Sequence, residues 1–279
     1  VNQRMLRTFR DAGYQLSQHL DEDVIALAFE IEPTAQSQAV LASREQRAEA
    51  RSVQQLLAPG SIAVVGASRR PGTVGHALLR HLRDGRFTGR LAVVHPQAAD
   101  ILGVPCLPSL RQVPGGIDLA IVAVPAEQVL SVVPDAAAAG VAGLVVVSGG
   151  FADADDEGVA RQRSLVAAAR SLGVRIVGPN ALGLVNTDPG VRMNASLVAR
   201  MPRQGRIGFF CQSGALGSSI LERVRSRGLG ISTFVSAGNR ADVSGNDLLQ
   251  YWLQDDATDV AMLYLESIGN GRKFARLVR

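Results

Sequence analysis

The sequence predicts an α/β protein with parallel, doubly wound sheets, and three observations support this fold class. Short continuous runs of Val, Ile, Leu and Ala recur from Pro59 onward, which is typical of strands buried on both faces of a parallel sheet. Segments with an apolar residue every three or four positions alternate with these runs, as in doubly wound folds. An apolar content of 47% with only 4% aromatic residues indicates cores of aliphatic side chains.

The segment before Pro59 follows a different pattern. Residues 14–20 and 24–31 predict the two strands of a hairpin, which Pro33 closes. A two-stranded hairpin is at best marginally stable by itself, so we expect residues 1–33 to be the remnant of an upstream domain. Residues 34–58 mix charged and apolar side chains and predict a linker helix.

The first α/β domain is expected to span residues 59–200. The prolines between Val94 and Leu119 predict that this connection is mostly loop. Pro134 is expected to interrupt the helix in which it lies. The predicted strands are residues 62–65, 91–94, 119–124, 143–147 and 175–177, and the predicted helices are residues 73–84, 126–139 and 157–172.

A second α/β domain is expected over residues 201–279. Its last residues read as the beginning of a further helix, so we expect this domain to be incomplete. The predicted strands are residues 206–210, 231–235 and 260–265, and the predicted helices follow a turn at residues 212–215 and cover residues 247–253.

The segment from Ser61 to Gly75 organises the chain, because it reads as a buried strand, a glycine-containing loop and a helix start. This arrangement aims backbone N–H groups at one point and suits a phosphate or pyrophosphate. A plain tight turn is the alternative interpretation. A protein that binds NAD is expected to carry an acidic residue at the end of the second strand, where this chain has His95-Pro96-Gln97, so NAD is the less favoured ligand.

The segment Cys211-Gln212-Ser213-Gly214-Ala215 repeats the strand, turn and helix pattern. A Ser hydroxyl and unpaired N–H groups at a helix N-terminus suit inorganic phosphate, and a simple N-cap by Ser213 is the alternative. Residues 147–151 and 178–183 end the fourth and fifth strands. Because the carboxyl ends of parallel strands meet at one edge, we expect these loops to share a site with the first loop.

Composition argues against several other classes of function. A net charge of +4, with the basic residues spread along the chain, does not indicate nucleic-acid binding. No apolar run approaches the roughly 20 residues of a membrane span, no export leader is recognised, and two cysteines fit a reducing compartment, so a cytoplasmic location is expected. The four histidines lack metal-ligand spacing, so no metal is expected. Cys211 is expected to serve packing, in the core or in a loop, and not as a nucleophile, because no histidine follows His95.

A set of ordered motifs carries a resemblance to a known family. The motifs are Val65-Gly66-Ala67-Ser68 with Pro71-Gly72-Thr73-Val74-Gly75, Val124-Pro125-Ala126, Ser148-Gly149-Gly150-Phe151, Gly178-Pro179-Asn180 and Gln212-Ser213-Gly214-Ala215. In this order they resemble the ADP-forming acyl-CoA synthetases, relatives of the succinyl-CoA synthetase α chain. The resemblance implies a CoA-binding Rossmann domain followed by a flavodoxin-like, succinyl-CoA ligase-like domain that is truncated at its C-terminus. It also implies a reaction that converts acyl-CoA, phosphate and ADP into acid, CoA and ATP through an acyl phosphate and a phosphohistidine.

The same resemblance implies which residues bind ligands. Asn180 and the segment Ser213-Gly214-Ala215 are expected to face the phosphate and the acyl group. After the proline that follows the second strand, the family often has a lysine that meets a CoA phosphate, whereas this chain has Gln97. In the family a carboxylate assists the phosphohistidine, and Asp153 is the nearest candidate for it here. The histidine and the ATP-grasp part that binds ATP or ADP are not in this sequence, so no catalytic residue is assigned and no activity is expected from the chain alone. The residues implied to bind CoA or acyl-CoA are Gly66, Ser68, Arg69, Pro71, Gly72, Val74, Gly75, Pro96, Val124, Pro125, Ser148 and Asn180.

Residues 6–32 with the Arg-Glu-Gln-Arg segment of the linker resemble the tail of a GNAT acetyltransferase domain. Three functions therefore stay open: the CoA-handling part of an ADP-forming synthetase, a synthetase-like module that senses CoA or acyl-CoA in a GNAT protein acetyltransferase, and an NAD-dependent dehydrogenase. The missing acid after the second strand argues against the third. The implied partners are CoA or a short acyl-CoA, phosphate, a downstream ATP-grasp half and an upstream GNAT domain, and a homo-oligomer is left open.

Overall fold

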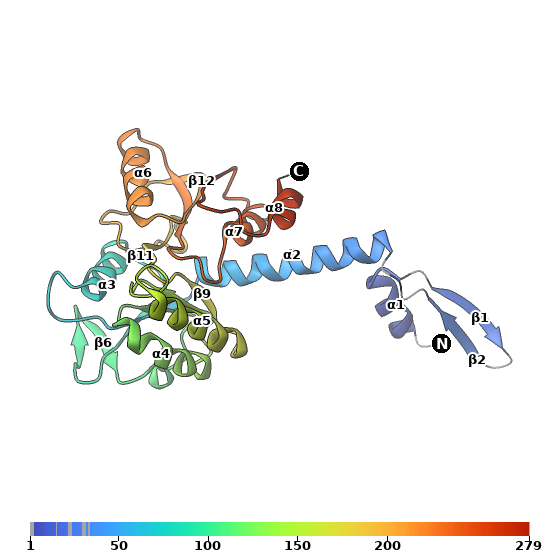
Figure 1. Ribbon diagram of the computed structural model, residues 1–279, viewed down its shortest axis with the longest axis horizontal. Helices are drawn as coiled ribbons and strands as arrows, with labels where there is room; N and C mark the ends of the chain where they lie inside the picture. Colours follow the sequence, from blue (N-terminus) through green and yellow to red (C-terminus); the bar gives the residue numbers. More distant parts are fainter. Residues whose placement is uncertain (1–2, 15, 22–23, 30–31, 33, 279) are drawn as a thin grey trace. The chain divides into compact units, whose positions relative to one another are not determined.

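The computed structural model describes residues 3–14, 16–21, 24–29, 32 and 34–278. Part of the expected hairpin turn, the end of its second strand and Pro33 lie outside these residues. The chain divides into two compact units, Val1–Glu49 and Ala50–Arg279, and each is described by itself. Figure 1 gives the order of the elements along the chain.

The first unit contains the predicted hairpin. Strands β1 (Ser17–Asp21) and β2 (Val24–Ala28) pair in antiparallel fashion, with Ser17 opposite Ala28. A helix that the sequence pattern does not predict, α1 (Gln3–Asp11), precedes them. The predicted linker helix is α2 (Ala35–Leu57), and the Thr34 hydroxyl oxygen caps it by accepting the Ser37 N–H at 3.1 Å.

The second unit begins with a seven-stranded sheet in the order β5-β6-β4-β3-β7-β8-β9. Every pairing is parallel except that of β5 with β6. The strand order reverses between β3 and β7, which is where ligands bind in doubly wound sheets. The strands are β3 (Ser61–Val65), β4 (Arg90–Val94), β5 (Asp100–Ile101), β6 (Val104–Leu107), β7 (Leu119–Val122), β8 (Gly143–Val146) and β9 (Arg175–Val177).

One expectation for this region was wrong. Helix α4 (Ala126–Ala138) runs through Pro134 without interruption, because buried Val133 and Ala136 on either side hold that turn against the sheet. The connection after β4 is mostly loop, as expected, and it also contains β5, β6 and a short 3-10 helix at Leu110–Gln112. The other helices of this part are α3 (Val74–Asp84) and α5 (Asp156–Ser171).

A second sheet has the order β11-β10-β13-β12-β14, in which β13, β12 and β14 are parallel and β10 and β11 are antiparallel. The sequence pattern does not predict β10 and β11. The chain therefore changes sheets between β9 and β10, while the domain limits at 59–200 and 201–279 stay predictions. The elements are β10 (Gly183–Asn186), β11 (Met193–Ser196), β12 (Gln204–Cys211), α6 (Gly214–Ser226), β13 (Ile231–Ser236), α7 (Gly245–Trp252), β14 (Val260–Tyr264) and α8 (Gly271–Leu277).

Side chains alternate between the two faces of the first sheet, as the pleat of a strand requires. Ala63 and Val65 of β3 belong to the cluster that α4 and α5 cover, whereas Ile62 and Val64 belong to the cluster that α3 covers. All five residues of β3 are buried. The prediction of an α/β fold with strands buried on both faces is therefore confirmed.

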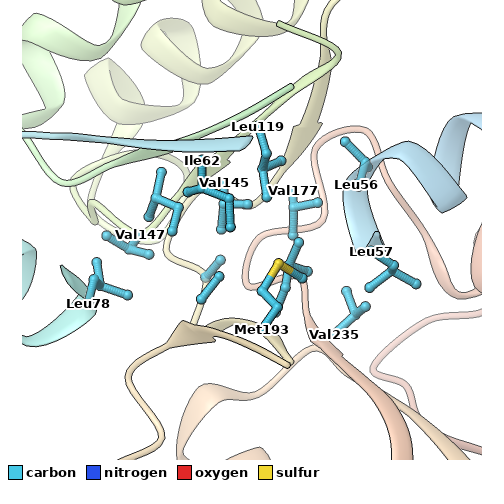
Figure 2. Packing of buried hydrophobic residues seen from close by; sticks show 14 of the residues in the cluster. Leu56, Leu57, Ile62, Leu78, Leu119, Val145, Val147, Val177, Met193 and Val235 are labelled. Carbon is cyan, nitrogen blue, oxygen red and sulfur yellow. The ribbon is translucent and has the colours of Figure 1, made fainter. Parts of the chain in front are cut away.

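The last turn of α2 contributes to the core of the second unit. Leu56 and Leu57 are at most 2% exposed and share a cluster with Val177 of β9 and Met193 of β11 (Figure 2). The side-chain amide of Asn186 in β10 donates to the Leu57 carbonyl at 2.9 Å. The end of α2, the first sheet and the second sheet thus form one packed body.

Helix α6 and the second sheet enclose a separate cluster of buried side chains around Phe209 and Phe234. The two rings pack with their centroids 5.2 Å apart. Within the described part of the chain, none of the helices combines the length and the apolar character needed to cross a membrane.

Candidate functional site

Two glycines around the loop between β3 and α3, Gly66 in the loop and Gly75 in the first turn of α3, have no room for a side chain. Gly66 has a φ of +90°, and a Cβ there would lie 2.6 Å from the Ala123 carbonyl oxygen after β7. A Cβ on Gly75 would lie 2.3 Å from the Gly66 carbonyl oxygen. Gly72, with a φ of +88°, has nothing within 4 Å of its Cβ position and faces open space. The first turn of α3, the end of β3 and the end of β7 therefore meet with only backbone between them.

Hydrogen bonds within this loop fix its shape. The Ser68 hydroxyl oxygen accepts the Arg70 N–H at 3.1 Å, and the Thr73 hydroxyl donates to the Arg70 carbonyl at 3.1 Å. The Arg69 guanidinium donates to the Asp100 carbonyl of β5 at 3.3 Å. Arg69, Arg70, Pro71 and Val74 are exposed, so the loop presents two cationic residues to solvent.

The end of β4 carries no acidic group. The imidazole Nδ1 of His95 accepts the N–H groups of Gln97 and Ala98, at 3.2 and 3.0 Å, and holds a tight turn around the exposed Pro96. These residues therefore do not supply the carboxylate that binds the ribose hydroxyls at this position in an NAD-binding sheet.

The loops after β7, β8 and β9 are joined directly. The Ser148 hydroxyl donates to the Val124 carbonyl at 2.5 Å, and the Asn180 N–H donates to the Ser148 carbonyl at 2.9 Å. Pro125 follows Val124 and immediately precedes α4. The structure thus brings together the predicted site residues of three loops at the carboxyl edge of the first sheet.

The N-terminus of α6 lies beside the loop that carries Asn180. Ser213 is the N-cap of α6, and its hydroxyl oxygen accepts the Leu216 N–H at 3.4 Å. A Cβ on Gly214 would lie 3.7 Å from the side chain of Leu182, whose own N–H donates to the Ser236 hydroxyl at 3.3 Å. Ala215 is exposed at the first turn of the helix. The Ser213–Ala215 turn and the Asn180 loop therefore border the same part of the molecule.

The loop after β13 fastens the Asn180 loop in place. A Cβ on Gly238 would lie 2.3 Å from the carbonyl oxygens of Pro179 and Asn180. The next residue, Asn239, donates its backbone N–H to the Pro179 carbonyl at 2.9 Å and its side-chain amide to Asp153 at 2.8 Å. One residue of the loop after β13 thus holds two loops of the first sheet.

Asp153 is occupied in supporting its own loop. Its carboxylate accepts the N–H groups of Gly150 and Phe151, at 3.2 and 3.1 Å, in addition to the Asn239 amide. Partial burial by itself raises the pKa of Asp153, but these hydrogen bonds to the ionised form outweigh it and leave the pKa below its usual value. The expected candidate for a histidine-assisting carboxylate is therefore a structural anchor in this fold.

Cys211 is fully buried, which confirms the prediction that it serves packing and places it in the core. Its thiol donates to the Ser213 carbonyl at 2.9 Å, and burial raises the pKa of the thiol, so the nucleophilic thiolate is disfavoured. Among the residues that the structure describes, no group of three or more His, Cys, Asp or Glu side chains could hold a metal ion.

Comparison with known proteins shows which family models these loops match. Residues 60–187 match the family model of the CoA binding domain, and residues 204–279 match that of the succinyl-CoA ligase like flavodoxin domain. Acetate–CoA ligase [ADP-forming] I of Archaeoglobus fulgidus is 41% identical over 227 residues, which are 81% of this chain and 33% of the relative. The chain therefore contains ADP-forming acyl-CoA synthetase α-like domains, a CoA-binding domain followed by a succinyl-CoA ligase-like domain.

Other relatives agree with this assignment. The α subunit of acetate–CoA ligase [ADP-forming] II from Pyrococcus furiosus is 35% identical over 222 residues, which cover 79% of this chain and 48% of the relative. The solved dinucleotide-forming acetyl-coenzyme A synthetase 1 of Ca. Korarchaeum cryptofilum, in complex with phosphate and ADP, has a TM-score of 0.76 at 36% identity over 81% of this chain and 48% of that one. The chain spans between a third and a half of the length of these relatives.

Hydrogen bonds that motif spacing does not reveal join the Ser213 turn to the loop after β14. The side-chain oxygen of Gln212 accepts the N–H groups of Glu266, at 2.5 Å, and Ser267, at 3.2 Å, just after β14. Arg240 donates to the carbonyl and the hydroxyl of Ser267 at 2.6 and 2.8 Å. Glu266 therefore lies at the edge that carries Ser213. Its only sequence signal is its place immediately after a predicted strand.

Proposed function

We propose that this chain is the CoA-handling portion of an ADP-forming acyl-CoA synthetase. CoA or a short acyl-CoA binds along the loops after β3, β4, β7 and β8, and phosphate binds at the N-terminus of α6. The observation that carries this proposal is the close packing of Gly66 and Gly75 where the strand order reverses. Because only backbone separates the end of β3, the end of β7 and the first turn of α3, the N–H groups at the start of α3 lie where ligands bind in such sheets.

The residues around this loop fit the chemistry of CoA. The diphosphate of CoA needs N–H donors and cations, and the first turn of α3 offers the former while Arg69 and Arg70 offer the latter. The Arg69 guanidinium reaches the Asp100 carbonyl, in the same connection as Gln97, so it can supply the charge that the family's lysine would bring. The proposed CoA-contacting residues are those named from the motifs: Gly66, Ser68, Arg69, Pro71, Gly72, Val74, Gly75, Pro96, Val124, Pro125, Ser148 and Asn180.

The proposed phosphate site uses the N-terminal end of α6. The N–H groups of Gly214 and Ala215 lack partners within the helix, and the helix dipole favours an anion there by roughly 0.3–1 kcal/mol, or up to about 2 kcal/mol when the site is partly buried. The related synthetase crystallised with phosphate and ADP supports phosphate as the anion. The rival interpretation, a simple N-cap by Ser213, predicts no anion at this helix.

Isothermal titration calorimetry with CoA, acetyl-CoA, NAD and NADP tests the CoA site. We expect CoA and acetyl-CoA to bind and both nicotinamide cofactors to give no heat beyond dilution, because the turn that ends β4, His95 to Ala98, carries no carboxylate. Tight NAD binding without a response to CoA would instead favour the dehydrogenase alternative.

We further propose that residues 1–279 alone do not complete the synthetase reaction. The resemblance calls for a phosphate-accepting histidine after the second sheet's middle strands, whereas His19, His76, His81 and His95 all precede β5. Incubation with labelled phosphate and acetyl-CoA should therefore leave no acid-labile label on the chain. A phosphohistidine mapped to any of these four residues contradicts this expectation.

A second candidate function is a regulatory module of a GNAT protein acetyltransferase, with CoA or acyl-CoA as the sensed ligand. The observation in its favour is that Val1–Glu49 forms a compact unit of its own, which precedes the matched range beginning at residue 60. Both candidates place the protein in the cytoplasm with CoA as partner. An assay of acetyl transfer from acetyl-CoA to lysine peptides, run on this chain joined to a GNAT domain at its N-terminus, separates the two candidates. CoA should change the transfer rate if the chain is a regulatory module and leave it unchanged if the chain is a synthetase portion.

A further inference from the structure

His76 is a buried histidine that the motifs do not include. It lies in the first turn of α3 and is 8% exposed. Its Nδ1 is 2.8 Å from the carbonyl oxygen of Ser68 in the preceding loop. A carbonyl oxygen only accepts, so Nδ1 must carry the proton and donate it.

This hydrogen bond sets the direction of one peptide group. The peptide bond is planar and trans, so the C=O of Ser68 and the N–H of Arg69 point in opposite directions. With the carbonyl held toward His76, the Arg69 N–H points away from α3. Among the described residues, this N–H has no hydrogen-bond partner, whereas the neighbouring Arg70 N–H is taken by the Ser68 hydroxyl.

We propose that His76 is a positioning residue that turns the Ser68–Arg69 peptide so that the Arg69 N–H can donate to a phosphate group of CoA. The inference rests on the proposed function, because it adds a donor to the CoA site. Without the imidazole, the Ser68 carbonyl loses its partner and the peptide is free to rotate, so the donor is no longer held in its binding direction.

The chain contains a matched control in the same helix. His81 is 5% exposed, and its Nδ1 lies 2.9 Å from the Ser196 carbonyl of β11. It therefore makes the same kind of buried hydrogen bond, but to a strand outside the CoA loop. A purely structural role predicts equal effects at the two positions.

Calorimetric titration of the full chain with CoA tests the proposal in His76→Leu, His76→Asn, His81→Leu and His81→Asn. We expect His76→Leu to raise the Kd for CoA roughly fivefold, which is about 1 kcal/mol at 1.4 kcal/mol per factor of ten. His76→Asn should restore the Kd to within about twofold of wild type, because the asparagine amide nitrogen occupies nearly the position of Nδ1. His81→Leu should lower the melting temperature with little change in the Kd.

The outcomes separate the two levels of inference. If wild type binds CoA and folded His76→Leu binds it equally well, or if both leucine variants weaken binding alike, the positioning role is wrong while the proposed function stands. If wild type does not bind CoA, both are wrong. Should His76→Leu not fold, His76→Gln replaces it, because the longer side chain keeps an amide but moves its N–H away from the Ser68 carbonyl. A Kd for His76→Gln equal to that of His76→Asn then overturns the proposal.

Discussion

Replacing Gly75 with alanine perturbs the contact between the first turn of α3 and the loop after β3. The added Cβ lies 2.3 Å from the Gly66 carbonyl oxygen and 2.8 Å from the Ala67 Cα, whereas ordinary contacts begin at 3.4 Å. Helix and loop must therefore move apart by about 1 Å, the difference between 3.4 and 2.3 Å. Overpacking of this kind typically costs roughly 1–3 kcal/mol, so we expect the free energy of unfolding to fall by about 2 kcal/mol.

Urea unfolding followed by circular dichroism measures this loss, and calorimetric titration measures its effect on CoA binding. The displaced loop should lose at least one hydrogen bond to CoA, worth about 1 kcal/mol, so the Kd should rise roughly fivefold or more. Gly271→Ala is the control, because its Cβ meets nothing within 4 Å and its φ lies outside the left-handed region. Wild-type stability and wild-type affinity in Gly75→Ala would refute the argument.

Three further predictions concern other parts of the site and the core. Ser213→Ala should lower stability by about 1 kcal/mol and weaken phosphate binding; calorimetry that finds phosphate affinity unchanged would leave only the cap. Asn239→Ala removes a hydrogen-bond donor to the Asp153 carboxylate. The pKa of Asp153 is lower in the folded chain than the unfolded value of 3.8, so the ionised carboxylate stabilises the fold above that pH. This stabilisation is lost as the pH falls through the folded pKa. Urea titrations should therefore show a loss of about 1 kcal/mol at about pH 6 that shrinks at about pH 3, and a loss equal at both would contradict the assignment. Trp252→Phe leaves the buried Thr233 hydroxyl without its 2.8 Å donor, and thermal unfolding should show a loss of about 1–3 kcal/mol.

The sequence predicts the strands whose buried positions are filled by aliphatic residues, such as β3 and β7. It does not predict β10 and β11, because buried positions in these strands carry polar side chains. Asn186, Asn194 and Ser196 are at most 5% exposed, yet each is satisfied by a hydrogen bond. Only the acceptor of Asn186 lies far away in the chain, 129 positions before it, whereas Asn194 and Ser196 bond to near neighbours. Polar residues at buried positions make the local pattern resemble that of a loop.

The same distinction applies to the candidate site. Glycines after a strand and a serine before a helix are local features, so the loops at Gly66 and Ser213 can be predicted from spacing alone. Asn239 reaches its partner Asp153 across 86 positions of sequence. Its role follows only from the packing of the second sheet against the first, which no local pattern encodes.

The burial of Leu56 and Leu57 bears on how such proteins can recombine. The composition changes at Pro59-Gly60, which would look like a natural place to join this chain to a different upstream part. A cut there would remove two leucines from a core to which each contributes roughly 1.5–3 kcal/mol, and would leave the Asn186 amide without its acceptor. A functional exchange of modules must therefore carry the last two turns of α2 along with the sheets, with its crossover inside the helix near Ala50.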